Sequence, residues 1–368
     1  MYIPFVDLHT QYRTIKKEIN VTINDVIKNS SFIKGKHVLD FEKEFAKKHN
    51  VKHCIGVGNG TDALYIVLKM LGIGEGDEVI TTALSWISTS ETISQTGAKP
   101  VFVDIEKDYF TISALKINEK INSKTKAILP VHLYGQCARI DEIKKICEKN
   151  NLFLVEDCAQ SHFAEYNKQK VGTFGIASTF SFFPGKNLGA YGDAGAIITN
   201  DDELAIKCRM FANHGALEKH KHQIEGINSR LDGIQAAILN VKLKYIDKWN
   251  NNRLKNALYY NKLLSDIPEI KTPKIRENAK HIFHIYCIRA EKRDELKNFL
   301  LQNKVEVAIH YPTALPLLPA YKHFNFISSD FPVASGYTKK ILSLPMFPEL
   351  SKKQIEHVVS LIKKFYGL

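Results

Sequence analysis

Hydrophobic and polar positions repeat in two ways along the chain, and the change between them divides the predicted structure. Apolar residues recur at helical spacing over 11–28, and a second amphipathic segment covers 40–49. From residue 51 onward, short apolar runs typical of buried strands alternate with amphipathic segments. This alternation predicts an N-terminal helical arm followed by a large α/β domain with a mostly parallel sheet.

The elements of the large domain follow one another with short connections. Residues 229–264 have a strongly helical composition, and three asparagines at 250–252 predict a kink or break in this helix. Before it, strands are predicted at 54–57, 78–81, 101–104, 126–131 and 152–157 and on both sides of Lys186, with helices at 61–71, 88–96, 140–149 and 202–212.

The last third of the chain predicts a smaller domain of α+β type. Prolines at 268 and 273 separate it from the long helical run. We therefore expect an N-terminal arm and large domain over 1–249 and a small C-terminal domain over 250–368. Within the small domain, strands are predicted at 281–288, 305–309 and 341–344, and helices at 294–303, 332–340 and 352–366.

Composition narrows the class of protein. The 368 residues are 44% hydrophobic and 24% charged, which is typical of a soluble globular protein, and no apolar run reaches the roughly 18 residues that span a bilayer. The first residues show no basic region followed by an apolar one, so we expect no secretory signal and a cytoplasmic location. The six cysteines are scattered without a Cys-x-x-Cys pair, which is typical of reduced core thiols.

The formal net charge of +12 raises the question of a nucleic-acid partner. The lysines are spread along predicted helices rather than clustered, which is typical of solvated helix faces. We therefore expect no nucleic-acid partner, and we expect the charge to attract anionic nucleotide substrates.

Candidate chemistry centres on Lys186, which interrupts two β-rich runs. Glycines allow backbone to approach a ligand closely, and a partly desolvated lysine amine loses its proton readily and becomes a nucleophile. A solvated surface turn is the alternative interpretation of the same stretch. The neighbouring glycines are Gly185, Gly189, Gly192 and Gly195.

A second stretch favours the chemical interpretation. The predicted buried strand at 152–157 ends in Asp157, and open α/β sheets bind ligands at the carboxyl ends of their strands. A lysine that bonds to a carbonyl and an acid that keeps a pyridine nitrogen protonated are the minimal equipment for pyridoxal phosphate. Lys186 and Asp157 fit these two catalytic roles.

With these residues in view, the chain resembles the DegT-like nucleotide-sugar aminotransferases, a branch of the fold type I pyridoxal-phosphate enzymes, over nearly its whole length. Some members of this family are dehydratases in which histidine replaces the lysine, so Lys186 implies transamination. The matching motifs are Asn-Gly-Thr-Asp-Ala at 59–63, Glu-Asp at 156–157 with Gln160, Phe-Phe-Pro-Gly-Lys-Asn-Leu-Gly at 182–189 with Gly-Asp-Ala-Gly at 192–195, Asn-Ser-Arg at 228–230 with Gln-Ala-Ala at 235–237, and His-Tyr-Pro at 310–312.

The resemblance assigns residues to the cofactor phosphate. It implies that Gly60, Thr61 and Asp62 bind the phosphate, mainly through backbone donors at a helix start, and that Ser181 adds a hydroxyl. Taken alone, Thr61 and Asp62 could simply cap a helix. In the family the asparagine at the position of Asn228 reaches the phosphate held by the neighbouring subunit, which implies a homodimer with composite active sites.

The resemblance also assigns residues to the cofactor ring and the substrate. Trp86 would stack on the ring, although a core tryptophan is the alternative. Gln160 would bind the 3-hydroxyl of the ring. Arg230, His310 and Tyr311 would contact the substrate.

Three histidines form a cluster that metal sites also use. His214, His220 and His222 lie close together in the sequence, and imidazoles bind first-row metals. No matching carboxylate spacing accompanies them, and transamination needs no metal. We therefore expect no metal site.

The resemblance implies transfer of an amino group from L-glutamate to a nucleotide-linked keto sugar. The stretch at 183–195 resembles the branch that aminates C3, whereas members acting at C4 more often carry a histidine before the lysine and Gly-Glu-Gly-Gly after it. We therefore expect a dTDP-linked 3-keto-6-deoxyhexose as substrate, in deoxyamino-sugar synthesis for a surface polysaccharide such as lipopolysaccharide.

Two other functions stay open at this point. The first is action on UDP-2-acetamido-3-keto-glucuronate, whose carboxylate would need a cation such as Arg230. The second belongs to a different class, a DNA-binding regulator built on the same fold. No helix-turn-helix pattern stands apart from the β/α alternation, which disfavours the regulator.

Overall fold

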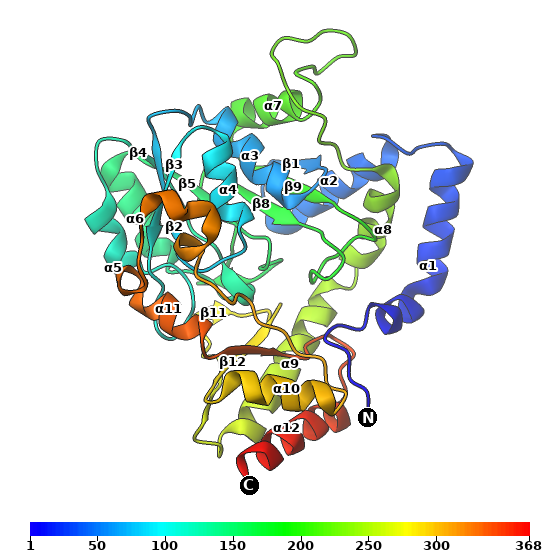
Figure 1. Ribbon diagram of the computed structural model, residues 1–368. Coiled ribbons are helices and arrows are strands. Elements are labelled where there is room, and N and C mark those ends of the chain that lie inside the picture. Colours follow the sequence, from blue (N-terminus) through cyan, green and yellow to red (C-terminus); the bar gives the residue numbers. More distant parts are fainter.

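The computed structural model describes residues 1–368, and a seven-stranded sheet forms its centre (Figure 1). The strand order is β1-β9-β8-β5-β4-β2-β3. Only β9 runs antiparallel to its neighbours, and the other neighbouring pairs are parallel, which confirms the predicted mostly parallel sheet. The strands are β1 (His53–Val57), β2 (Glu78–Thr82), β3 (Lys99–Val103), β4 (Thr125–Leu129), β5 (Phe153–Asp157), β8 (Ala177–Ser181) and β9 (Gly195–Thr199).

Helices cover both faces of this sheet because successive strand residues point to opposite sides. Val79 and Val155 join one apolar cluster with α3, α4 and α7, whereas Ile80 and Leu154 join another with α2, α6 and α8. Both faces are therefore buried, as in other parallel sheets. The helices are α2 (Lys36–His49), α3 (Gly60–Met70), α4 (Ser88–Gln95), α6 (Ile140–Asn150), α7 (Asp202–Phe211) and α8 (Gly233–Leu243).

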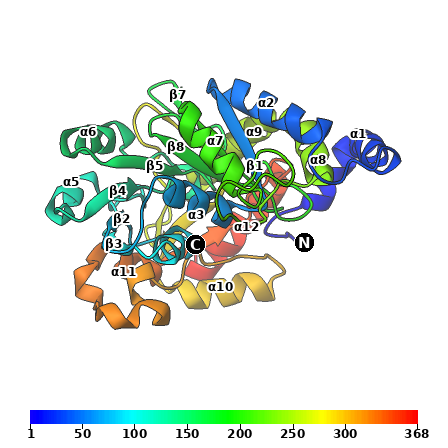
Figure 2. The ribbon, with the colours of Figure 1, turned by 90° about the horizontal axis from the view of Figure 1, so that it is seen from above.

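The predicted N-terminal helical arm is confirmed. Helix α1 (Leu8–Lys28) begins after Asp7, whose carboxylate accepts a hydrogen bond of 2.8 Å from the backbone N–H of Thr10. It packs against α8 and lies at the edge of the molecule in both views (Figures 1 and 2).

A second core lies below the large sheet (Figure 1). Three antiparallel strands in the order β10-β12-β13 pack with α9, α10 and α12, and Ile3 from the N-terminus joins the same apolar cluster. The division at 249/250 stays a prediction. The elements are α9 (Ile246–Leu264), β10 (Ile270–Lys271), β12 (Tyr286–Ala290), α10 (Arg293–Gln302), β13 (Ile341–Leu344) and α12 (Lys352–Tyr366).

Smaller elements connect the two cores. Phe331 and Ile341 from the C-terminal third pack with Phe102 of the large sheet. No helix of the protein is both long and apolar enough to cross a bilayer. The remaining α-helices and strands are α5 (Ala114–Ile117), β6 (Glu165–Tyr166), β7 (Gln169–Lys170), β11 (Ala279–Lys280) and α11 (Pro332–Thr338), of which β11, β6 and β7 form a small sheet.

The predicted helix break at 250–252 is wrong. Helix α9 continues through these asparagines, and the chain turns earlier, at residues 244–245 between α8 and α9. The reason is that Asn250 is buried and fully engaged. Its Nδ2 donates to the carbonyl of His162 at 2.9 Å, and its Oδ1 accepts from Asn187 Nδ2 at 2.8 Å.

Two predicted strands also need correction. Residues 305–309 make only isolated bridges, Val305 with Ile3 and Ala308 with Ser343 of β13, so they do not form a strand. The strand predicted at 281–288 begins only at Tyr286. Phe283 just before it has a left-handed φ of 44°, which interrupts the extended backbone.

Candidate active site

Lys186 lies in a tight turn between β8 and β9 at the carboxyl edge of the sheet. Its backbone N–H donates to the carbonyl of Phe183 at 2.8 Å, which closes the turn. Gly189 is required there, because a Cβ at this position would lie 2.3 Å from the carbonyl oxygen of Pro184. The amine is partly buried, and this burial lowers the pKa of Lys186 to about 8 although the charge of Asp157 acts in the opposite direction. Lys186 therefore offers a neutral amine at mildly alkaline pH.

Asp157 is the last residue of β5 and is buried. Its Oδ1 accepts a hydrogen bond of 3.0 Å from the N–H of Ala159, and its Oδ2 accepts one of 2.9 Å from Thr89 Oγ1. Burial raises the pKa of Asp157, whereas these two hydrogen bonds and the charge of Lys186 act to lower it. A cation placed beside this carboxylate would stabilise its ionised form.

Gln160 and Tyr311 lie together although 151 residues separate them. Gln160 Nε2 donates to the Tyr311 hydroxyl at 3.0 Å, and Gln160 Oε1 accepts from the N–H of Tyr134 at 2.7 Å. The ring of Trp86, which is 58% exposed, lies 5.7 Å from the ring of Tyr311. An exposed tryptophan offers an aromatic face to a ligand, so Trp86 is not the core residue of the alternative interpretation.

His310 lies close enough to Lys186 for the lysine charge to act on its imidazole. Its ring stacks on Phe5 with 5.5 Å between centroids, and its Nδ1 lies 2.9 Å from Ser343 Oγ. The Tyr134 hydroxyl donates to the backbone carbonyl of His310. Burial, with the nearby charge of Lys186, lowers the pKa of His310 to about 4, so the imidazole is neutral at pH 7.

The start of α3 forms an anion cradle against Ser181. Asn59 caps the helix, because its side chain accepts from the N–H of Asp62 at 2.8 Å. A Cβ on Gly60 would lie 2.7 Å from Cβ of Ser181, so only glycine allows the helix start to approach this strand. The Thr61 hydroxyl lies 2.8 Å from Ser88 Oγ. The first N–H groups of a helix have no partner in the helix, which makes this cradle suited to a phosphate.

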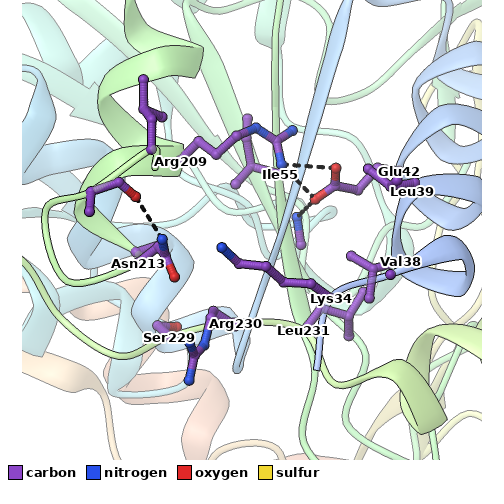
Figure 3. A pocket seen from close by; sticks show the side chains of 15 residues that line it. Lys34, Val38, Leu39, Glu42, Ile55, Arg209, Asn213, Ser229, Arg230 and Leu231 are labelled. Atoms are coloured by element: carbon purple, nitrogen blue, oxygen red, sulfur yellow. Dashed lines mark hydrogen bonds and ion pairs between the residues drawn. The ribbon is translucent and has the colours of Figure 1, made fainter. Parts of the chain in front are cut away.

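Asn228 and Arg230 do not join the residues around Lys186 in this chain. Ser229 between them accepts a hydrogen bond of 3.0 Å from the N–H of Gly58, whereas the side chain of Asn228 is exposed. Arg230 instead lines a separate cavity of about 300 Å³ (Figure 3). Figure 3 shows Lys34 reaching into this cavity.

The histidine cluster does not converge on a metal position. His222 Nδ1 lies 2.7 Å from the backbone carbonyl of His214, and no third ligand joins the pair. The three side chains whose ligand atoms do converge are His132, Glu156 and Cys158. Glu156 there accepts from His132 and from three backbone N–H groups, so its oxygens are already used to anchor the neighbouring loop.

Sequence reasoning missed two residues of the site. Thr89 bonds Asp157, but a threonine in a short helix carries no signal for that role. His284 lies close enough to Lys186 for the lysine charge to act on the His284 imidazole. The sequence pattern did not indicate this position, because residues 281–288 were interpreted as a strand.

A family model covering residues 13–363 matches the chain, and its description is the DegT/DnrJ/EryC1/StrS aminotransferase family. The chain belongs to this family. A crystal structure of DesV from S. venezuelae superimposes on this aminotransferase with a TM-score of 0.97 at 37% identity, covering 99% of this chain and 98% of that one. The predicted fold class is thereby confirmed.

Three curated relatives cover nearly the whole aminotransferase. A "Pleiotropic regulatory protein" of Geobacillus stearothermophilus is 46% identical over 100% of this chain and 99% of its own length. The dTDP-3-amino-3,6-dideoxy-alpha-D-galactopyranose transaminase of Aneurinibacillus thermoaerophilus is 40% identical, covering 99% of both chains. The UDP-2-acetamido-2-deoxy-3-oxo-D-glucuronate aminotransferase of Pseudomonas aeruginosa is 39% identical, covering 96% of this chain and 98% of its own.

The family depends on pyridoxal phosphate, and the residues present here fit that group. The fit rests on the cradle between Gly60 and Ser181, which a single Cβ would fill, and on the buried carboxylate of Asp157 close to the amine of Lys186. The first suits a phosphate and the second suits a pyridine nitrogen. These features lie at the carboxyl edge of the sheet, where α/β proteins bind their ligands.

Proposed function

We propose that this protein transfers an amino group from L-glutamate to C3 of a dTDP-linked 3-keto-6-deoxyhexose, in the synthesis of a deoxyamino sugar for a surface glycan. The observation that carries the proposal is the partly buried amine of Lys186, with its lowered pKa, beside the buried carboxylate of Asp157. Support for the substrate class comes from relatives whose names specify C3 amination of dTDP- or UDP-linked sugars at 39–40% identity.

The cofactor would be held by residues from four strand ends. Gly60, Thr61 and Asp62 at the start of α3 would bind its phosphate together with Ser181. The exposed ring of Trp86 would cover its aromatic face, Gln160 would bind its 3-hydroxyl, and Asp157 would pair with its ring nitrogen. When bound, pyridoxal phosphate supplies an electron sink for carbanion chemistry.

The chain's own residues supply proton transfer and orientation. Lys186 Nζ would take the proton from the α-carbon of the amino donor and pass a proton on to the bound cofactor, and in the second half-reaction it would deliver a proton to C3 of the sugar. Its pKa of about 8 allows it to act as base and as acid at mildly alkaline pH. The hydrogen bonds from Thr89 and Ala159 favour the ionised form of Asp157 against its burial, and a positively charged ring nitrogen beside it would be stabilised in its protonated form. His310 and Tyr311 would contact the sugar.

The second candidate is a UDP-linked 2-acetamido-3-keto-glucuronate. It is favoured by one observation, Arg230, whose guanidinium carries a positive charge that could pair with a uronate carboxylate. The deoxyhexose has no carboxylate and needs no such cation. The stretch at 183–195, which resembles the C3 branch, fits both candidates. The dTDP sugar is preferred because an arginine after Asn-x is common in the family whatever the substrate, so Arg230 is weak support for the uronate.

A direct comparison of the two keto sugars tests the proposal. Purified protein with pyridoxal phosphate and L-glutamate is expected to aminate the dTDP-linked sugar faster, as measured by mass spectrometry of the nucleotide sugar and of 2-oxoglutarate. Arg230→Ala is expected to leave this rate within about threefold, with Arg230→Lys as the matched control. A clear preference for the uronate that is lost in Arg230→Ala would select the UDP-linked substrate instead.

We further propose a homodimer in which Asn228 of one subunit serves the phosphate bound by its partner. Asn228 is exposed in the single chain, which supports a role at a contact with a second copy. Phe32, Ile33 and Leu39 near the arm are also exposed, with 45%, 51% and 63% of their surface accessible, as expected for an interface. Closed twofold symmetry is the commonest arrangement for such an assembly.

Complementation between inactive variants tests the composite site. Lys186→Ala and Asn228→Asp are each expected to be inactive alone, and mixing them with subunit exchange should restore about a quarter of the activity, because half of the dimers then contain one intact site. Each variant taken alone through the same exchange is the control. If no activity returns although exchange is confirmed by mass spectrometry, Asn228 does not act across the dimer.

A regulator of transcription is the alternative from a different class. The name of the Geobacillus relative is consistent with it. The arrangement of Lys186, Asp157 and Gln160 has no role in DNA binding, whereas an aminotransferase requires it. A gel-retardation assay with arbitrary DNA at moderate salt, run beside the turnover assay, separates the two functions.

A further inference from the structure

Asn187, which follows Lys186 directly, is buried and is held by three hydrogen bonds. Its Nδ2 donates to Asn250 Oδ1 at 2.8 Å and to the carbonyl of Ile282 at 3.2 Å. Its Oδ1 lies 3.1 Å from Nδ1 of His284. Each of these partners lies in a segment far from the lysine turn in sequence, so the turn is fixed from outside as well as by its own backbone.

The hydrogen-bond partners determine which side-chain atom is oxygen and which is nitrogen in Asn250 and Asn187. Asn250 Nδ2 donates to the carbonyl of His162 at 2.9 Å, which leaves its Oδ1 as the acceptor for Asn187. Because Nδ2 of Asn187 faces that oxygen and the carbonyl of Ile282, its Oδ1 must face His284. An amide oxygen only accepts, so Nδ1 of His284 carries the proton and Nε2 carries the lone pair.

The backbone of His284 is held in place by Arg253 and by the close approach of Gly135. Arg253 Nη1 donates to the carbonyl of His284 at 3.2 Å and to the carbonyl of Met346 at 2.8 Å. On the other side the chain passes Gly135 so closely that a Cβ there would lie 3.2 Å from the N–H of His284. The imidazole is therefore presented from a rigid segment between the two cores.

Burial and the surrounding positive charges keep the imidazole of His284 neutral. Burial lowers the pKa of His284 well below its usual value, and the positive charges of Lys186 and Arg253 act in the same direction, with smaller effects from His162 and His310. A neutral imidazole cannot act as a competing charge beside the lysine. It keeps the same tautomer, and hence the same hydrogen bond to Asn187, across the neutral pH range.

From these contacts we infer that His284 is a positioning residue for Lys186, acting through the hydrogen bond from its Nδ1–H to the Oδ1 of Asn187. The bond fixes the residue next to Lys186 against α9 and the 281–285 segment, so the amine stays in its partly buried position. The inference rests on the proposed role of Lys186 and is independent of which sugar the enzyme uses.

The test measures Lys186 in cofactor-free protein, without any substrate. Labelling of its amine by acetic anhydride is followed against pH by mass spectrometry of the peptide, with exposed Lys145 of α6 as the reference in each sample. Wild-type protein is expected to show a midpoint near pH 8. In His284→Ala and His284→Gln the midpoint should rise by about one unit, because a loosened turn admits water to the amine and favours its charged form.

A conservative variant separates positioning from packing. His284→Asn places an amide N–H near the former Nδ1 and is expected to keep the midpoint near pH 8, whereas His284→Gln extends past it. Asn187→Ala should behave like His284→Ala, and the double variant should add nothing further. Circular dichroism confirms that each variant is folded.

Two outcomes would overturn the inference. One is a midpoint that stays at the wild-type value in His284→Ala and His284→Gln. The other is a midpoint that rises in His284→Asn as much as in His284→Ala. That result would show that the hydrogen bond from Nδ1 does not hold the lysine turn, and it would assign the role to Nε2. Because the labelling uses no sugar or amino donor, a failure of the proposed reaction would leave this result unaffected.

Discussion

Replacing Asp157 with asparagine is expected to lower turnover by several orders of magnitude while cofactor binding persists. Asparagine keeps an oxygen for Thr89 or for Ala159 but carries no charge, so it cannot stabilise a protonated ring nitrogen. A loss of about a thousandfold corresponds to about 4 kcal/mol of barrier. The effect is expected already in the first half-reaction, measured by stopped-flow at saturating L-glutamate.

A matched variant shows whether the loss of rate in Asp157→Asn comes from the lost negative charge or from a changed position of the side chain. Thr89→Val removes only the hydroxyl that donates to Asp157 at 2.9 Å, and a single hydrogen bond to a charged group contributes about 1.5–3 kcal/mol. Its loss of rate should therefore be smaller than that of Asp157→Asn. Near-normal turnover in Asp157→Asn would show that this carboxylate does not support the ring.

Replacing Lys186 with alanine is expected to abolish turnover. The variant loses both the nucleophilic amine and the group that moves the proton, and Lys186→Arg should be equally inactive because its guanidinium stays charged. Lys145→Ala on the exposed face of α6 is the control, with activity expected at the wild-type level. Activity is measured as formation of amino sugar, and appreciable formation by Lys186→Ala would contradict the assignment.

The parallel sheet could be predicted from the sequence because its strands are buried on both faces and appear as short apolar runs between amphipathic helices. Asp157 at the end of β5 and Lys186 beyond β8 could be found for the same reason, since strand ends locate ligand sites. The resemblance to the family supplied the other residues of the site. Trp86 and Tyr311 are brought together by the packing of the C-terminal third on the large sheet, which has no local signal.

The errors arose where tertiary contacts override local preference. The asparagines at 250–252 favour a break, but buried Asn250 finds its partners in His162 and Asn187, so α9 continues. The segment before β12 has strand-forming residues, yet its contacts with Gly135 hold it out of the sheet. The same departure from a strand brings His284 to Asn187, next to Lys186, and no local sequence pattern indicates this contact.

Lys186 is expected to bond to pyridoxal phosphate, and peptide mapping after borohydride reduction tests for this bond. Purified protein loaded with the cofactor is reduced, digested and analysed by mass spectrometry, with Lys186→Arg treated in parallel. A single reduced adduct is expected on the peptide containing Lys186, and none is expected in the variant. A cofactor adduct on another lysine, with the Lys186 peptide unmodified, would contradict it.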